Sequence, residues 1–290
     1  MPKKSIGKIK EQTDKKKKDK DYKIYGVRKT DDFPKLDREL PRFLETMLEK
    51  GGGCLALFAP PGSGKSNFIS NLLLRDDFFK DMFEGGLYII SPTILNDMTS
   101  CHLKEYADFV DTEYSEELAT GIFKMLLDTP NEDKARNCLL FDDCLGSIKQ
   151  NTICNRIVST CRHNLSLVIF SLQAIKNGLP ATIRANISHT IVFYQPSSKQ
   201  LSDVVELHSL MGGEENFLKC YNEATGVKYG FLACDFRDMK MYRWGGETEE
   251  PVEVWSRYDE NGELIKEDIQ TTDSIKTGNK KNIREGVQAQ

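Results

Sequence analysis

The sequence contains no run that approaches about 18 uninterrupted apolar residues, the length that a helix needs to span a bilayer. Its N-terminus is charged from the start and is not followed by the apolar segment of a secretion signal. The eight cysteines form no Cys-x-x-Cys pair and match no Cys/His spacing, so we expect no zinc site. Scattered cysteines of this kind favour an intracellular protein. The chain also lacks internal repeats and the regular strand spacing of a jelly roll.

Charge is distributed unevenly along the 290 residues. The first 20 residues hold nine lysines and three acids, a balance of +6, whereas the rest of the chain has a balance of −10. Lysine blocks such as residues 15–18 are most often solvated tails, and the alternatives are a nucleic-acid-binding arm or a nuclear-targeting signal. We expect a basic, disordered tail over residues 1–30, a globular domain over residues 31–256 and a polar tail over residues 257–290.

Residues 59–66 read Ala-Pro-Pro-Gly-Ser-Gly-Lys-Ser, which is the pattern of a phosphate-binding P-loop. An apolar, strand-like segment precedes them at residues 54–58, and a helix-compatible segment follows at residues 67–74. A P-loop requires this strand–loop–helix context. The usual first glycine is replaced by Ala59, a small residue at the end of the strand. An ordinary Gly/Ser-rich turn is the alternative interpretation.

The chemistry of this loop predicts binding of ATP with Mg²⁺. Gly62 and Gly64 let successive backbone N–H groups point at the phosphates, Lys65 reaches the β- and γ-phosphates, and the Ser66 hydroxyl is placed to hold the metal. The helix that begins here adds its positive dipole end to the anion site. The expected nucleotide-binding residues are Ala59, Pro60, Pro61, Gly62, Ser63, Gly64, Lys65, Ser66 and Asn67.

Short apolar runs alternate with helix-compatible segments along the chain. Beyond the P-loop strand, the runs lie at residues 87–90, 138–141, 165–172 and 190–193. This alternation predicts an α/β fold in which a mostly parallel central sheet is flanked by helices. Residues 229–244 predict a C-terminal β-hairpin appended to the sheet. Because ligands bind at the carboxyl ends of parallel strands, the polar residues that end the runs are the functional candidates.

Two of these runs end in residues suited to phosphoryl chemistry. The run at residues 138–141 leads into Asp142 and Asp143, which is the Walker B arrangement. We expect Asp142 to complete the Mg²⁺ shell with Ser66, and Asp143 to act as a base or to position water. The run at residues 165–172 ends before Gln173, whose amide can contact the γ-phosphate or the attacking water; a surface glutamine is the alternative.

Two arginines are candidates for stabilising charge on the transferred phosphoryl group, which needs a cation beyond Lys65 and Mg²⁺. Arg162 precedes the run at residues 165–172, and Arg184 precedes the run at residues 190–193. Either can reach the nucleotide of a neighbouring subunit as an arginine finger, and an ion-paired surface arginine is the alternative for each. We favour Arg162.

The order and spacing of these motifs carry a resemblance to a known family. The segments APPGSGKS, SPT, LLFDD, CRHN followed by SLVIFSLQ, and LPATIRANISHTIVF occur in that order. Over about residues 55–244 the chain resembles the genome-packaging ATPases of large eukaryotic DNA viruses and virophages, a poxvirus-type branch of the FtsK–HerA superfamily. The resemblance implies a RecA-like P-loop domain in which the strand before Gln173 lies between the P-loop and Walker B strands.

The resemblance also implies roles and partners. The family pattern assigns Lys65 and Ser66 to nucleotide and Mg²⁺, the two aspartates to metal and water, Gln173 to sensing, and Arg162 to activation of a neighbouring subunit. It implies a homo-oligomeric ring of five or six subunits that moves double-stranded DNA into a preformed capsid, with viral capsid proteins as partners. Such a protein acts where virions assemble, in the host cytoplasm or nucleus, and needs no membrane.

Two alternatives remain open at the level of the sequence. One is a nucleotide-gated module that binds DNA or a partner and hydrolyses little ATP, because Asp143 is shorter than the glutamate common at this position. The other is a cellular-type FtsK–HerA translocase, which usually carries further domains. The acidic main body is not typical of a protein that coats DNA, although a motor needs few lysines in a central pore.

Overall fold

The computed structural model describes residues 33–128, 135–144, 148, 152–175 and 178–265. The predicted basic tail and most of the predicted C-terminal tail lie outside these residues. None of the helices in the described ranges is both long and apolar enough to cross a membrane.

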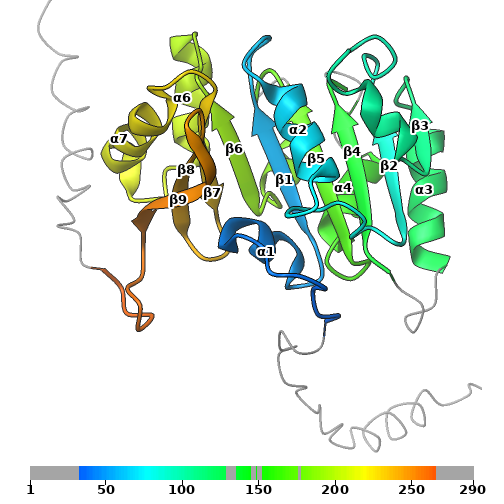
Figure 1. Cartoon of the computed structure of the whole chain (residues 1–290), viewed down its shortest axis with the longest axis horizontal. Helices are drawn as coiled ribbons and strands as arrows, with labels where there is room; N and C mark the ends of the chain where they lie inside the picture. The colour runs from blue at the N-terminus through cyan, green and yellow to red at the C-terminus, as the bar shows by residue number, and fades with distance from the viewer. Residues whose placement is uncertain (1–32, 129–134, 145–147, 149–151, 176–177, 266–290) are drawn as a thin grey trace, which may run out of the picture. The chain divides into compact units, whose positions relative to one another are not determined.

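A nine-stranded sheet runs through the described part of the chain, with strand order β3-β2-β4-β5-β1-β6-β7-β8-β9 (Figure 1). The first six strands in sequence pair in parallel, whereas β7, β8 and β9 pair antiparallel at one side. Their bounds are β1 Gly53–Phe58, β2 Gly86–Ile90, β3 Phe109–Asp111, β4 Asn137–Asp142, β5 Ser166–Leu172, β6 His189–Phe193, β7 Gly230–Asp235, β8 Lys240–Gly245 and β9 Thr248–Ser256.

This topology confirms the predicted α/β class with a mostly parallel sheet. It also confirms that β5 lies between the P-loop strand β1 and the Walker B strand β4. The predicted C-terminal hairpin is β7–β8, and β9 extends it by a third strand that we did not predict. The short strand β3 was likewise not predicted, because its three residues give no clear pattern.

Helices cover both faces of the sheet. One hydrophobic cluster joins the sheet to α1 and α2, and the other joins it to α3, α4, α5, α6 and α7. Side chains of β1 alternate between the two clusters, so every residue of this strand is buried. The helices are α1 Arg42–Leu48, α2 Lys65–Leu74, α3 Glu116–Asp128, α4 Ile153–Thr160, α5 Ala181–Arg184, α6 Ser198–Leu207 and α7 Gly213–Thr225, with a 3₁₀ helix η2 at Cys101–Glu105.

Helix α3 illustrates how the local sequence produces a covering helix. Its buried residues, Ala119, Ile122, Phe123 and Leu126, recur at helical spacing and form one apolar stripe. The Ser115 hydroxyl accepts a hydrogen bond from the Leu118 N–H at 3.1 Å, which satisfies one free donor of the first turn. The two acids in that turn favour the positive end of the helix dipole. These local choices agree with the position of α3 against the sheet.

Candidate functional site

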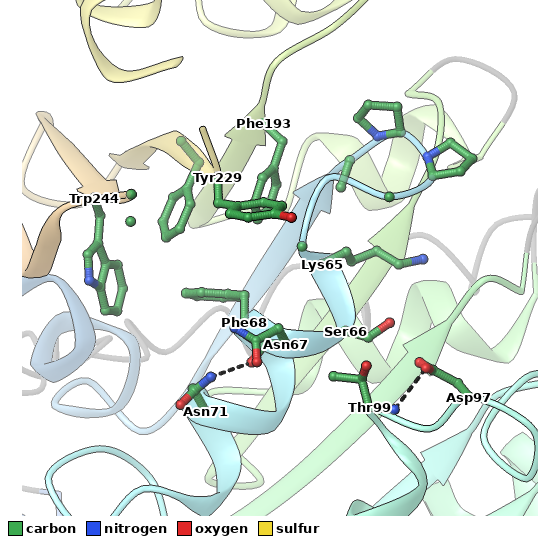
Figure 2. A pocket seen from close by; sticks show the side chains of 18 of the residues that line it. Lys65, Ser66, Asn67, Phe68, Asn71, Asp97, Thr99, Phe193, Tyr229 and Trp244 are labelled. Carbon is green, nitrogen blue, oxygen red and sulfur yellow. Dashed lines mark hydrogen bonds between the residues drawn. The ribbon is translucent and has the colours of Figure 1, made fainter. Parts of the chain in front are cut away.

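A cleft of about 850 Å³ lies at the carboxyl ends of the parallel strands. The P-loop, the loop after β2 and the ends of β4 and β5 form its polar side, and aromatic residues from α2, β6, β7 and β8 form its apolar side (Figure 2). Of the nine predicted nucleotide-binding residues, all except Ser63 line this cleft. The structure therefore brings the sequence-predicted loop to the edge of the sheet where ligands of such folds bind.

The backbone of the P-loop is shaped to receive an anion. Gly62 and Gly64 have φ angles of 75° and 101°, in the left-handed region that favours glycine. Gly64 is also the N-cap of α2, so the free N–H groups of the first helical turn follow it directly. A left-handed glycine leading into a helix N-terminus makes a concave set of donors suited to phosphate.

Lys65 is paired with both predicted acids. Its Nζ lies 2.7 Å from Asp143 Oδ1 and 3.3 Å from Asp142 Oδ1, and its side chain is 12% exposed. Asp142 is the last residue of β4, whereas Asp143 turns out of the strand with a φ of 50°. The Asp143 N–H donates to the Ser171 carbonyl at 3.0 Å, which ties this turn to β5. The structure thus gathers the cation and the two carboxylates that the sequence placed some 77 positions apart.

The donor set around Asp142 fits a Mg²⁺ ion. The Ser91 hydroxyl donates to Asp142 Oδ2 at 2.9 Å and fixes the carboxylate. Apart from the ion pairs with Lys65, no hydrogen-bond donor in the described ranges reaches Oδ1 of Asp142 or Oδ1 of Asp143, although both atoms are buried. Carboxylate and hydroxyl oxygens are the ligands that Mg²⁺ prefers. Ser66 and Asp142 are therefore the residues that would hold the metal.

The sequence reasoning missed one carboxylate at this site. Asp97 lies in the loop after β2 and lines the cleft, on the same side as Ser66 (Figure 2). It accepts hydrogen bonds from the Thr99 N–H at 3.0 Å and from the Ser100 hydroxyl at 2.7 Å. Burial raises the pKa of Asp97, but these hydrogen bonds outweigh it and lower the pKa below its ordinary value. Its only sequence signal is that polar residues follow the strand, as they follow β4 and β5.

Gln173 lies where the sequence predicted it. It is the residue after β5, it lines the cleft together with Asp143, and its backbone carbonyl accepts a hydrogen bond from Gln200 Nε2 at 3.1 Å. Since β5 lies between β1 and β4, the end of this strand is held between the P-loop and the two acids.

The two predicted arginines do not line the cleft of their own chain. Arg162 precedes β5, and its Nε donates to the Lys50 carbonyl at 3.4 Å, near the amino end of β1. Arg184 ends α5 and donates to the Leu179 carbonyl at 2.7 Å. Both lie apart from Lys65 because residues that precede a parallel strand lie at the opposite edge of the sheet from residues that follow it.

Comparison with known proteins adds a family and a fold. A family model described as "Poxvirus A32 protein" matches residues 41–227. No curated protein matches the chain.

Among solved structures, the DNA-packaging ATPase B204 from Sulfolobus Turreted Icosahedral Virus is similar with a TM-score of 0.50. It is 15% identical, and the match covers 67% of this chain and 97% of that one. B204 from Sulfolobus turreted icosahedral virus 2, in complex with ATP-gammaS, matches with a TM-score of 0.48 and 15% identity, covering 67% and 98% of the two chains. The cytoplasmic domain of the type VII secretion ATPase EccC from Thermomonospora curvata matches with a TM-score of 0.47 and 12% identity, and the match covers 74% of this chain and 27% of that one. The first of these similarities shows a shared fold.

Proposed function

The chain belongs to the poxvirus A32 protein family and is a P-loop ATPase, and from this premise we propose that it is the motor that moves double-stranded DNA into a preformed viral capsid. The observation that carries the proposal is that Lys65, Asp143 and Gln173 line one cleft beside the P-loop, where Lys65 also contacts Asp142. A site that only held a nucleotide would not need a second carboxylate at the lysine or an amide in the same cleft. These groups suit a reaction in which water attacks the terminal phosphate.

We propose that ATP binding exchanges the partners of Lys65. When phosphates occupy the P-loop, the Lys65 ammonium turns to them and releases the carboxylates that it contacts at 2.7 and 3.3 Å. Asp142, held by Ser91, is then free to face the metal, and Asp143 to accept a proton from water. The Mg²⁺ ion, when bound, neutralises phosphate charge. Gln173 is placed to contact the same water or the terminal phosphate.

A homo-oligomeric ring would complete the site in this proposal. Because neither arginine lines the cleft of its own chain, Arg162 or Arg184 would act on the nucleotide of a neighbouring subunit. Mixing Arg162→Ala with Lys65→Ala subunits tests this for Arg162, since each type then supplies what the other lacks. We expect partial recovery of ATP turnover in mixed rings. If ATP turnover does not recover at any mixing ratio, although mixed rings are verified by mass, Arg162 does not act on a neighbouring subunit.

The basic segment within the first 20 residues is proposed to add nonspecific affinity for DNA, since the rest of the chain carries a balance of −10. The site of action in the host would be the place of virion assembly, and capsid proteins would be the docking partners.

Steady-state ATP hydrolysis with and without double-stranded DNA tests the proposed motor. We expect turnover that DNA stimulates severalfold and that falls as salt rises, because phosphate contacts weaken with ionic strength. Nucleotide binding with equal, very slow turnover in both conditions would contradict the motor and favour a nucleotide-gated binding module.

A further inference from the structure

We propose that Tyr229 is the platform on which the adenine base of the bound nucleotide stacks. The inference rests on the proposed function, because it assumes that the P-loop holds the phosphates of the same nucleotide. Tyr229 lies two residues past the segment that the family model matches, which ends at residue 227. Neither the P-loop motif nor the family match assigns it a role.

Tyr229 is positioned against the P-loop. A Cβ atom placed on Gly64 would lie 3.3 Å from Tyr229 Cδ1, so the ring packs against the last glycine of the P-loop. Figure 2 shows the tyrosine above the start of α2 and near Phe193. A nucleotide anchored by its phosphates at residues 62–66 must place its ribose and base along the rest of the cleft. Tyr229 lines the cleft, and Figure 2 shows its ring apart from Asp97.

Tyr229 is also more exposed than the other aromatic residues of the cleft. The cleft has an aromatic side whose other members are packed together and are each at most 8% exposed: Phe68, Phe78, Phe193, Phe231 and Trp244. Their ring centroids lie 4.9 to 5.5 Å apart in contacting pairs, so these rings already cover one another's surfaces. Tyr229 is 53% exposed. Among the aromatic residues that line the described cleft, it alone presents a large open ring.

The backbone of Tyr229 is strained. Tyr229 has a φ of 63°, a conformation that is unfavourable for a bulky side chain and that glycine or asparagine adopts more readily. The residue sits in a tight turn, in which the Gly230 N–H donates to the Val227 carbonyl at 3.0 Å. Strain of this kind at the wall of a ligand cleft points to a side chain kept for its contact with the ligand.

The ammonium group of Lys228 lies over the face of the Tyr229 ring and competes with the base for it. Its Nζ lies 4.9 Å from the centroid of the Tyr229 ring. An exposed cation–π contact is weaker than the stacking of a base on an aromatic side chain, so the base displaces the ammonium. The freed lysine then lies close to a polyanionic ligand, which favours the exchange further.

The test compares two probes, Mg-ADP and inorganic tripolyphosphate, by isothermal titration calorimetry. Tyr229→Asn tolerates the left-handed backbone and is expected to bind ADP about tenfold more weakly, with the affinity for tripolyphosphate unchanged. Tyr229→Trp is expected to keep ADP binding within about threefold of the original protein, because the indole also stacks. Tyr194→Ala is the matched control, since Tyr194 is 60% exposed and does not line the cleft.

The outcomes separate this inference from the proposed function. If Tyr229→Asn binds ADP as tightly as the original protein, while the original protein hydrolyses ATP, the platform is overturned and the ATPase stands. An equal loss for both probes would also overturn it, because it would indicate damage to the P-loop and not to base stacking. If the original protein binds neither probe, the proposed function fails and the inference fails with it. An unfolding temperature of Tyr229→Asn at or above that of the original protein verifies that the fold is intact.

Discussion

Replacement of Lys65 by alanine is expected to lower ATP turnover by at least about 10²–10³-fold, the loss typical when one preorganised group that stabilises developing charge is removed. Lys65 lies at the start of α2, directly after the glycine that caps the helix, and its side chain is 12% exposed. A cation held at this depth acts on phosphate with little screening by water. Steady-state hydrolysis measured at saturating Mg-ATP checks the prediction.

The same variant has a second expected effect, on stability. Without Lys65, the neighbouring carboxylates of Asp142 and Asp143 lose the cation that contacts both of them. Leaving partly buried charges unpaired is costly, so the unfolding temperature should fall, and it should recover in part when Mg²⁺ is added. Lys80→Ala is the matched control, because Lys80 contacts Asp76 at 2.8 Å at the surface and away from the cleft. Turnover of Lys65→Ala close to that of the control would contradict the assigned site.

The central strands could be predicted because the sequence and the fold agree at each of them. Strands β1, β4 and β5 are buried along their whole length, and only near-continuous apolar runs satisfy two covered faces at once. The same physics locates the polar residues, because Asp142, Asp143 and Gln173 lie where buried strands end. Their common position at the carboxyl ends of the parallel strands could therefore be predicted from the sequence. The position of β5 between β1 and β4 came from the family resemblance and from no pattern in the residues.

The rest of the site depends on loop conformation, which periodicity does not encode. Asp97 lies seven residues beyond the end of β2, and its approach to Ser66 is set by turns within that loop. Tyr229 reaches the P-loop because it directly precedes β7, which pairs antiparallel with β6. Its left-handed backbone was not predictable, because glycine is the residue that usually marks this conformation. The edge strand β9 has no buried residue, and glutamates interrupt its apolar residues, so it gave no apolar run. Contacts that join segments far apart in sequence need the assembled fold.

Asp143→Asn is the variant expected to separate chemistry from binding. Asparagine tolerates the left-handed φ of 50° at this position and preserves the shape of the carboxylate, so the turn after β4 should remain intact. If Asp143 accepts the proton of the attacking water, kcat should fall by about 10²–10⁴-fold, the usual contribution of a general base. The KM for ATP should change by less than about threefold, since the phosphates and the metal keep their ligands.

Variants of the two neighbouring acids, Asp142 and Asp97, serve as comparisons for Asp143→Asn. Asp142→Asn should instead weaken Mg²⁺-dependent nucleotide binding, because Asp142 offers the buried oxygen that Ser91 leaves free. Asp97→Asn should reduce turnover only modestly if Asp97 merely orients the Ser66 hydroxyl. The reverse pattern, with turnover lost in Asp97→Asn and kept in Asp143→Asn, would identify Asp97, in the loop after β2, as the general base. All three carboxylates line the cleft or contact its lysine, so position alone does not separate their roles. An acid that accepts the proton of the water should affect kcat, whereas an acid that holds the metal should affect nucleotide affinity.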